Sequence, residues 1–186
     1  MSKKIAFAIF AFFVFAFVYS NSQTKRTYYT NKGKIIFISD NSLEVIRAQS
    51  DELKGIVGED NHSFAFAVRV MSFEGFKVAL QREHFNENYL ESGLYPNATF
   101  QGKIIDDFDF NKEGTSTVRA KGILKIHGVE QEKIIKVQLI KKGDVITAHC
   151  FFSILLNDYD IKIPRIVHDK ISPEIRIEVK ADLLKK

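Results

Sequence analysis

The sequence predicts an all-β, antiparallel protein of about eight strands with one short helical insertion. The first observation is a set of segments rich in β-branched and aromatic residues, of which residues 63–70 alternate most clearly between large apolar and small or charged side chains. The second is that short glycine-containing turns, such as Lys142-Gly143, join several of these segments. The third is the lack of regular strand–helix alternation, which argues against a parallel doubly wound sheet.

The predicted strands follow one another along the chain. They cover residues 34–39, a weaker early pair at 43–48 and 53–57 around Ser50-Asp51, and then 63–70, 98–104, 117–126, 132–142, 144–155 and 174–181. Gly128 permits a tight turn between two of them, and the strictly alternating 174–181 is the expected closing strand. Such strands protect their edges by closing into a barrel or by stacking as a sandwich. The residues by themselves leave both arrangements open.

A polar segment at residues 77–91 predicts the helical insertion. Glu83, Glu87 and Glu91 are spaced to share one helix face, and His84 lies three residues before Glu87. The segment lacks the His-Glu-x-x-His pattern of zinc enzymes. We therefore expect a solvated helix face there, with a metal site as the less favoured interpretation.

Residues 1–22 have the composition of a targeting segment. Two lysines precede a continuous apolar run at residues 5–18, which has the length of a secretory signal and is short for a bilayer span. We predict cleavage after Ser22, with cleavage after Ser20 as the alternative. An uncleaved N-terminal anchor is the competing interpretation.

Charge and cysteine content narrow the function classes. The chain has 27 basic and 23 acidic residues, and loss of the two leader lysines leaves 25 against 23, a net charge of about +2. That excess is too small to favour nucleic-acid binding. Residues 23–186 are enough for one domain with a substantial core. Cys150, the only cysteine, cannot form an internal disulfide and is expected to be a buried thiol.

No motif for catalysis or for a cofactor is evident in the sequence. Gly-x-Ser-x-Gly and glycine-rich phosphate loops are lacking, and the acidic clusters at 106–109 and 157–160 do not have calcium-loop spacing, so solvated turns are expected there. An enzyme that uses His84 and its neighbouring carboxylates is the weakest hypothesis. The excess of phenylalanine suits either a packed core or an eight-stranded barrel that holds one small ligand.

Two stretches of the chain resemble a known family. In the first, His84-Phe85-Asn86 leads to Tyr95-Pro96 and on to Phe100; the second is the glycine- and histidine-containing segment 122–129. Together they resemble the YceI-like family of secreted bacterial lipid-binding proteins, over about residues 33–181. The resemblance implies a single lipocalin-like β-barrel domain at 23–186. The family's late Arg-x-x-Phe-Gly segment is not present in this chain. Residues 156–164 occupy its place.

The resemblance also implies a function. The protein would be periplasmic or secreted, soluble after signal removal and non-enzymatic, with a polyisoprenoid or another long amphiphilic lipid as its partner and no cofactor. The predicted lining residues are Phe64, Phe66, Val68, Phe100, Ile123 and Phe152. The first three share a face of the alternating strand, Phe100 belongs to the family motif, and the last two are guesses.

Further expectations concern the two ends of the barrel. The helical segment would cover one side of it, with His84, Asn86 and Tyr89 fixing the connection to Tyr95-Pro96. Lys103 or Arg119 would meet a polar or anionic head group near a barrel mouth. The alternative function is a ligand-free, packed β-domain that acts through protein contacts in the cell envelope. The oligomeric state is left open.

The predicted leader is tested by mass. Export should remove residues 1–22, so the intact mass of the exported protein should correspond to a chain that begins at Gln23, or at Asn21 if the earlier site is used. A full-length species retained in the membrane would contradict the prediction.

Overall fold

Apolar and polar side chains alternate along eight segments of residues 26–186, the part of the chain that the computed structural model describes, and each segment forms a β-strand. The predicted leader lies outside these residues. The strands are β1 (Thr27–Asp40), β2 (Val45–Gly58), β3 (Ser63–Arg69), β4 (Asn97–Ile104), β5 (Gly114–Ile126), β6 (Val129–Lys142), β7 (Val145–Leu155) and β8 (Glu174–Lys185).

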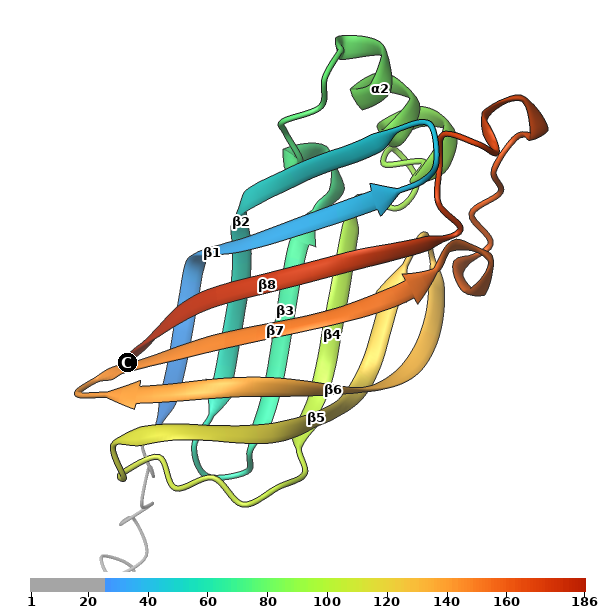
Figure 1. Cartoon of the computed structure of the whole chain (residues 1–186). Helices are drawn as coiled ribbons and strands as arrows, with labels where there is room; N and C mark the ends of the chain where they lie inside the picture. The colour runs from blue at the N-terminus through green and yellow to red at the C-terminus, as the bar shows by residue number, and fades with distance from the viewer. Residues whose placement is uncertain (1–25) are drawn as a thin grey trace, which may run out of the picture.

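The sheet closes on itself. Each strand pairs antiparallel with the next along the chain, and β1 pairs with β2 on one side and with β8 on the other (Figure 1). Closure leaves none of these eight strands with an open edge that could pair with another molecule. The prediction of an antiparallel barrel of about eight strands is confirmed, and the sandwich is excluded.

The connections at the two ends of the barrel differ. The longest one joins β3 to β4 and contains η1 (Val70–Ser72), the α-helix α2 (Ala79–His84) and a π-helical turn, η2 (Phe85–Tyr89). It confirms the helical insertion predicted near residues 77–91. The β7–β8 connection, with η3 (Leu156–Tyr159) and η4 (Arg165–Val167), lies at the same end, called here the α2 end (Figure 1). No helical segment within residues 26–186 has both the length and the apolar run that a bilayer crossing requires.

Two strands near the N-terminus are longer than predicted. β1 begins at Thr27 rather than at Lys34, and β2 runs unbroken through Ser50-Asp51, so the predicted pair of short strands is wrong. The β1–β2 register shifts on either side of Gly33, which marks an irregularity in the ladder rather than a chain reversal. The Glu52 N–H donates to Ser50 Oγ at 3.1 Å, a local contact that also occurs in turns.

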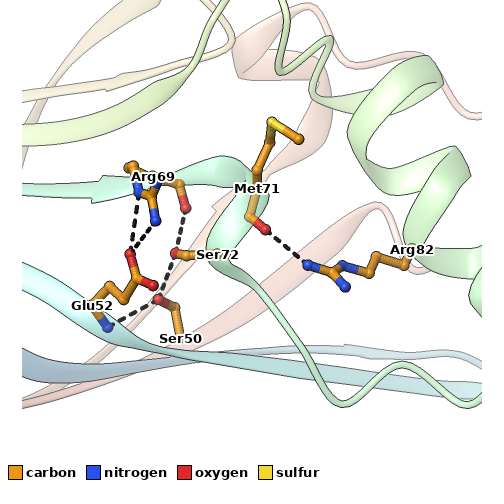
Figure 2. Close-up of polar contacts among 6 residues, drawn as sticks. All are labelled: Ser50, Glu52, Arg69, Met71, Ser72 and Arg82. Atoms are coloured by element: carbon orange, nitrogen blue, oxygen red, sulfur yellow. Dashed lines mark hydrogen bonds and ion pairs between the residues drawn. The ribbon is translucent and has the colours of Figure 1, made fainter.

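A chain of hydrogen bonds fixes the start of the β3–β4 connection to this irregularity (Figure 2). Ser50 Oγ accepts from Glu52 N–H, Ser50 and Ser72 hydroxyl oxygens are 2.7 Å apart, and Ser72 Oγ donates to the Arg69 carbonyl at 2.7 Å. Because the Ser72 hydroxyl proton is directed to that carbonyl, Ser50 is the donor between the two hydroxyls. All the bonds then point in one direction, an arrangement in which each polarises the next.

Charged groups reinforce the same junction from both sides (Figure 2). Arg69 Nε and Nη2 both donate to one carboxylate oxygen of Glu52, at 3.1 and 2.7 Å. On α2, Arg82 Nη2 donates to the Met71 carbonyl at 3.1 Å. The helix is therefore tied to the turn that follows β3, although its own six residues are too short to be stable alone.

Strands β4 and β5 approach closely where Gly102 pairs with Gly122. A Cβ on Gly102 would overlap the Lys121 carbonyl oxygen and lie 2.5 Å from the Gly122 Cα, and these are backbone atoms that cannot rotate away. The two strands can therefore keep this spacing only with glycine at the crossing.

This close approach yields a stability prediction. Gly102→Ala should lower the free energy of unfolding by about 1–3 kcal/mol, because the new methyl group forces the two backbones apart. Gly93→Ala is the matched control, since nothing lies within 4 Å of the position that its methyl group would take, and its stability should stay unchanged. Denaturant unfolding measures both, and equal effects would contradict the packing argument.

Candidate functional site

The barrel interior contains an apolar cavity of about 140 Å³. Inward-facing residues of all eight strands line it, and Thr99 and Cys150 are its only lining residues with a polar side-chain group. Alternation produces most of this wall, because every second side chain of a barrel strand points inward; consecutive residues line it only at 66–68 and 98–100. The cavity can accept an apolar group but offers almost nothing to hold a charged one.

A second cavity, of about 480 Å³, continues from the first toward the α2 end. The two share lining residues on five strands, namely Ile35, Val68, Ala98, Ile126 and Ile177. Residues of α2, η2 and the β7–β8 connection line its far side. One apolar passage therefore leads from the middle of the barrel to the α2 end.

Aromatic rings build the wall of the outer cavity. Phe37 of β1 contacts Phe73, Phe76 and Phe85, with ring centroids 5.5, 6.0 and 5.1 Å apart. Phe85 opens η2 and Phe73 follows η1, so these contacts hold the whole helical connection against the barrel.

Polar groups appear mainly at the rim of the outer cavity. Glu44, Gln81, His84 and Lys170 line it there. Gln81 Nε2 donates to Glu44 Oε1 at 2.8 Å, which joins α2 to the β1–β2 turn. The gradient from apolar interior to polar rim suits an amphiphilic guest.

The opposite end of the barrel is closed. Phe108 and Phe110, from the connection between β4 and β5, are buried with ring centroids 4.8 Å apart. Phe110 also stacks on Tyr28 of β1 at 5.6 Å. The passage is therefore blind, with its opening at the α2 end.

Five of the six predicted lining residues face the inner cavity. These are Phe64, Phe66, Val68, Phe100 and Phe152. Phe64 and Phe100 meet across β3 and β4 with ring centroids 4.8 Å apart. That these residues contact a ligand stays a prediction.

The sixth predicted lining residue, Ile123, does not face the cavity. Its neighbours Leu124 and Ile126 are buried and line the cavity, so alternation along β5 turns Ile123 to the outer face. Ile123 and Leu124 are both large and apolar, so the sequence does not indicate which of the two points inward. A register error of one residue exchanges the inner and outer faces of a strand.

Phe66 depends on a glycine of the neighbouring strand. It pairs with Gly55 of β2, and its ring lies where a side chain at position 55 would stand. The ring is half-buried, whereas Phe64 and Val68 on the same strand are buried. A substitution at Phe66 should therefore disturb the core less than one at either of these neighbours.

The cations predicted near a mouth lie elsewhere. Arg119 Nε donates to both carboxylate oxygens of Asp106. Arg119 and Lys103 both lie near the closed end of the barrel, on β5 and β4. Hydrogen bonds from the Arg119 side chain and backbone hold the pKa of Asp106 below its usual value. Neither Lys103 nor Arg119 is positioned to meet a head group at the α2 end.

Both acidic clusters that were expected as solvated turns carry a buried aromatic residue. Phe108 belongs to the closing plug, and Tyr159 is fully buried. Burial raises the pKa of the Tyr159 hydroxyl to about 12. Within residues 26–186, no three His, Cys, Asp or Glu side chains gather in a way that would hold a metal ion.

The two stretches noted as a family resemblance meet in space. His127 Nε2 lies 2.6 Å from Glu91 Oε2, and its Nδ1 lies 3.0 Å from the Tyr159 carbonyl. The same ring contacts Tyr95 edge-on at 4.8 Å, and Tyr95 lies directly over Gly128. Glu91 and Tyr95 thus fix the end of the helical connection, a role that was expected of His84, Asn86 and Tyr89.

Those three residues have other contacts. His84 lines the outer cavity, Tyr89 packs on the apolar cluster beneath it, and Asn86 Nδ2 donates to the Arg82 carbonyl at 2.9 Å within the helical connection itself. None of them reaches Tyr95 by a hydrogen bond among those the structure gives. His84 is therefore a rim residue.

Comparisons with known proteins agree with this geometry. The chain matches the YceI-like domain over residues 30–183. Its fold is similar to that of a polyisoprenoid binding domain from Saccharophagus degradans implicated in plant cell wall breakdown (TM-score 0.74, 14% identity, 86% of this chain and 98% of that chain).

Two further solved structures share the fold. They are BcnA of Burkholderia cenocepacia (TM-score 0.68, 16% identity, 82% of this chain and 96% of that chain) and a YceI protein of Campylobacter jejuni (TM-score 0.63, 14% identity, 80% and 90%). At such identities the likeness concerns the fold. No curated protein sequence matches the chain.

The lining thiol gives a chemical test of the cavity. Cys150, expected to be buried, is half-buried, and its desolvation among apolar side chains raises its pKa to about 12, so at about pH 8 only roughly one thiol in 10⁴ is ionised. A disulfide reagent should therefore label the native protein far more slowly than the denatured one at about pH 8, because so little of the native thiol is ionised. Equal rates in the two states would show that the thiol is exposed.

Proposed function

The chain belongs to the YceI-like family, and we propose that it is an exported, non-catalytic protein that holds a polyisoprenoid or another long amphiphilic lipid in its barrel. The observation that carries this proposal is the blind apolar passage, which is polar mainly at its rim. Each methylene group buried there contributes roughly 0.8 kcal/mol. A tail of about ten carbons retains several kcal/mol after the ordering cost.

The shape of the passage supports one orientation of the proposed lipid. The tail points toward Phe108 and Phe110, because the inner wall offers apolar contacts almost alone. The head group stays at the rim near His84 and Lys170, where hydrogen-bond donors and water are available. The reverse orientation would bury a polar group with no partner, which is strongly unfavourable.

The groups inside the passage support binding rather than a reaction. Cys150 is held in its protonated form by burial, which makes it a poor nucleophile. His84 lies at the rim, and the structure gives it no hydrogen bond to a carboxylate of residues 26–186 that would orient it as a base. Among the residues that line the two cavities, a nucleophile, a base and an oxyanion donor do not converge on one point.

Export is supported by the sequence alone. The leader expected at residues 1–22 suits a periplasmic or secreted protein, and the resemblance to secreted lipid-binding proteins points the same way. The ligand-free packed domain is the rival function. It has less support, because the two cavities leave space that side chains do not fill.

A charge placed on the inner wall tests the proposal. Phe66→Asp should reduce the lipid that organic solvent extracts from the purified protein to below about a tenth of the wild-type amount, because the carboxylate would face an apolar tail. Phe66 is chosen because its ring is only half-buried, so we expect the variant to fold.

The matched control is Ile123→Asp, which places the same charge on the outer face of the barrel. It should keep its lipid. Circular dichroism confirms that both variants fold. Absence of lipid from the wild-type protein, or equal loss from both variants, would favour the packed-domain rival.

A further inference from the structure

Three segments surround the opening of the passage at the α2 end. They are the β1–β2 turn, the region of α2, and the stretch around η4. Backbone and side-chain bonds join them, since Leu43 N–H donates to the Asp169 carbonyl at 3.2 Å and Gln81 Nε2 donates to Glu44. Asn41 Nδ2 adds a bond of 3.0 Å to the Ile171 carbonyl. The rim is therefore a connected structure.

Each of these segments exposes a large apolar side chain. Ile166 is 91% exposed, Leu43 70% and Leu80 55%. Of the four most exposed large apolar residues among those the structure describes, only Phe151 lies on the barrel wall; Ile166, Leu94 and Leu43 are at the α2 end. Exposed apolar residues gathered around one opening are a feature that interaction sites share.

The exposed residues continue the lining of the passage. Leu80 lines the outer cavity and is also half-exposed, and Val167 lines it immediately after the exposed Ile166. Apolar side chains therefore reach from the rim into the barrel, between the polar rim residues Glu44, Gln81, His84 and Lys170. A lipid tail that crossed the rim beside Leu80 and Val167 would meet apolar side chains there.

Basic residues flank Ile166 in particular, whereas the β1–β2 turn and the α2 region also carry the acids Glu44, Glu83 and Glu87. Residues 162–170 contain Lys162, Arg165 and Lys170 against a single acid, Asp169. None of these three basic side chains forms an ion pair with another residue of 26–186. All three are exposed and can reach anionic groups beside Ile166.

We propose that the α2 end docks on a lipid bilayer that contains anionic lipids, with Leu43, Leu80 and Ile166 inserted among the head groups. Apolar tips flanked by lysine and arginine are the combination that binds a membrane surface. The passage would then open directly onto the bilayer, so a lipid tail could transfer without exposure to water. This inference rests on the proposed lipid-binding function.

Vesicle co-sedimentation tests the docking surface. The protein recovered after export is mixed with vesicles of phosphatidylcholine alone, or of phosphatidylcholine with a minority of phosphatidylglycerol. Binding should be stronger to the anionic vesicles and should weaken with salt. Ile166→Asp and Leu43→Asp should each lower the affinity about tenfold, since each loses an apolar insertion and adds repulsion.

Phe151→Asp is the matched control, because Phe151 is 65% exposed but lies on β7, on the outer wall. Its vesicle affinity should equal that of the wild type. Lack of binding to either vesicle, or an equal loss in Phe151→Asp, would overturn the docking surface.

Solvent extraction of the same samples separates the two proposals. Lipid held by a protein that does not bind vesicles refutes the docking surface and leaves the proposed function intact. Vesicle binding by a protein that never contains lipid supports the docking surface as a membrane contact and refutes the lipid-holding function.

Discussion

Closure of the sheet is the constraint on which the rest of the structure depends. Because β1 bonds to both β2 and β8, every strand has two neighbours and the inner face has no route to solvent through an edge. The paired strands satisfy one another's backbone polar groups, so the side chains decide what the interior holds. The two ends are then the places where the molecule can open, and they differ in construction.

Aromatic side chains fill one end of the barrel, and the helical connection surrounds an opening at the other. Phe108, Phe110 and Tyr28 close the first with stacked and edge-on rings. At the α2 end, the helical connection is held in place by the Ser50–Ser72 hydroxyl pair near its start and by His127–Glu91 near its end. None of these four residues lines the passage, and that leaves the passage itself apolar.

Much of the barrel could be predicted from the sequence, because period-two alternation reports directly on a sheet with one buried face. Alternation does not identify the inward-facing residue where two consecutive residues are apolar, as at Ile123 and Leu124. The Ser50-Asp51 stretch has the composition of a turn, and hence it predicts two strands where β2 is continuous. The plug could not be predicted because Phe108 stands among aspartates, and no sequence pattern states which end of a barrel is open.

The residues that close the passage belong to the β4–β5 loop. The depth of the passage therefore depends on this loop and not on the hydrogen-bonded strands of the wall. Phe108 and Phe110 lie between β4 and β5, so replacing either would change the space at the closed end without removing a residue from the ladder. If a lipid occupies the passage as proposed, the single entrance also imposes an order on exchange, because one occupant has to depart before its successor can enter. Exchange is then governed by residence time, and a longer tail, which dissociates more slowly, sets a slower rate of exchange.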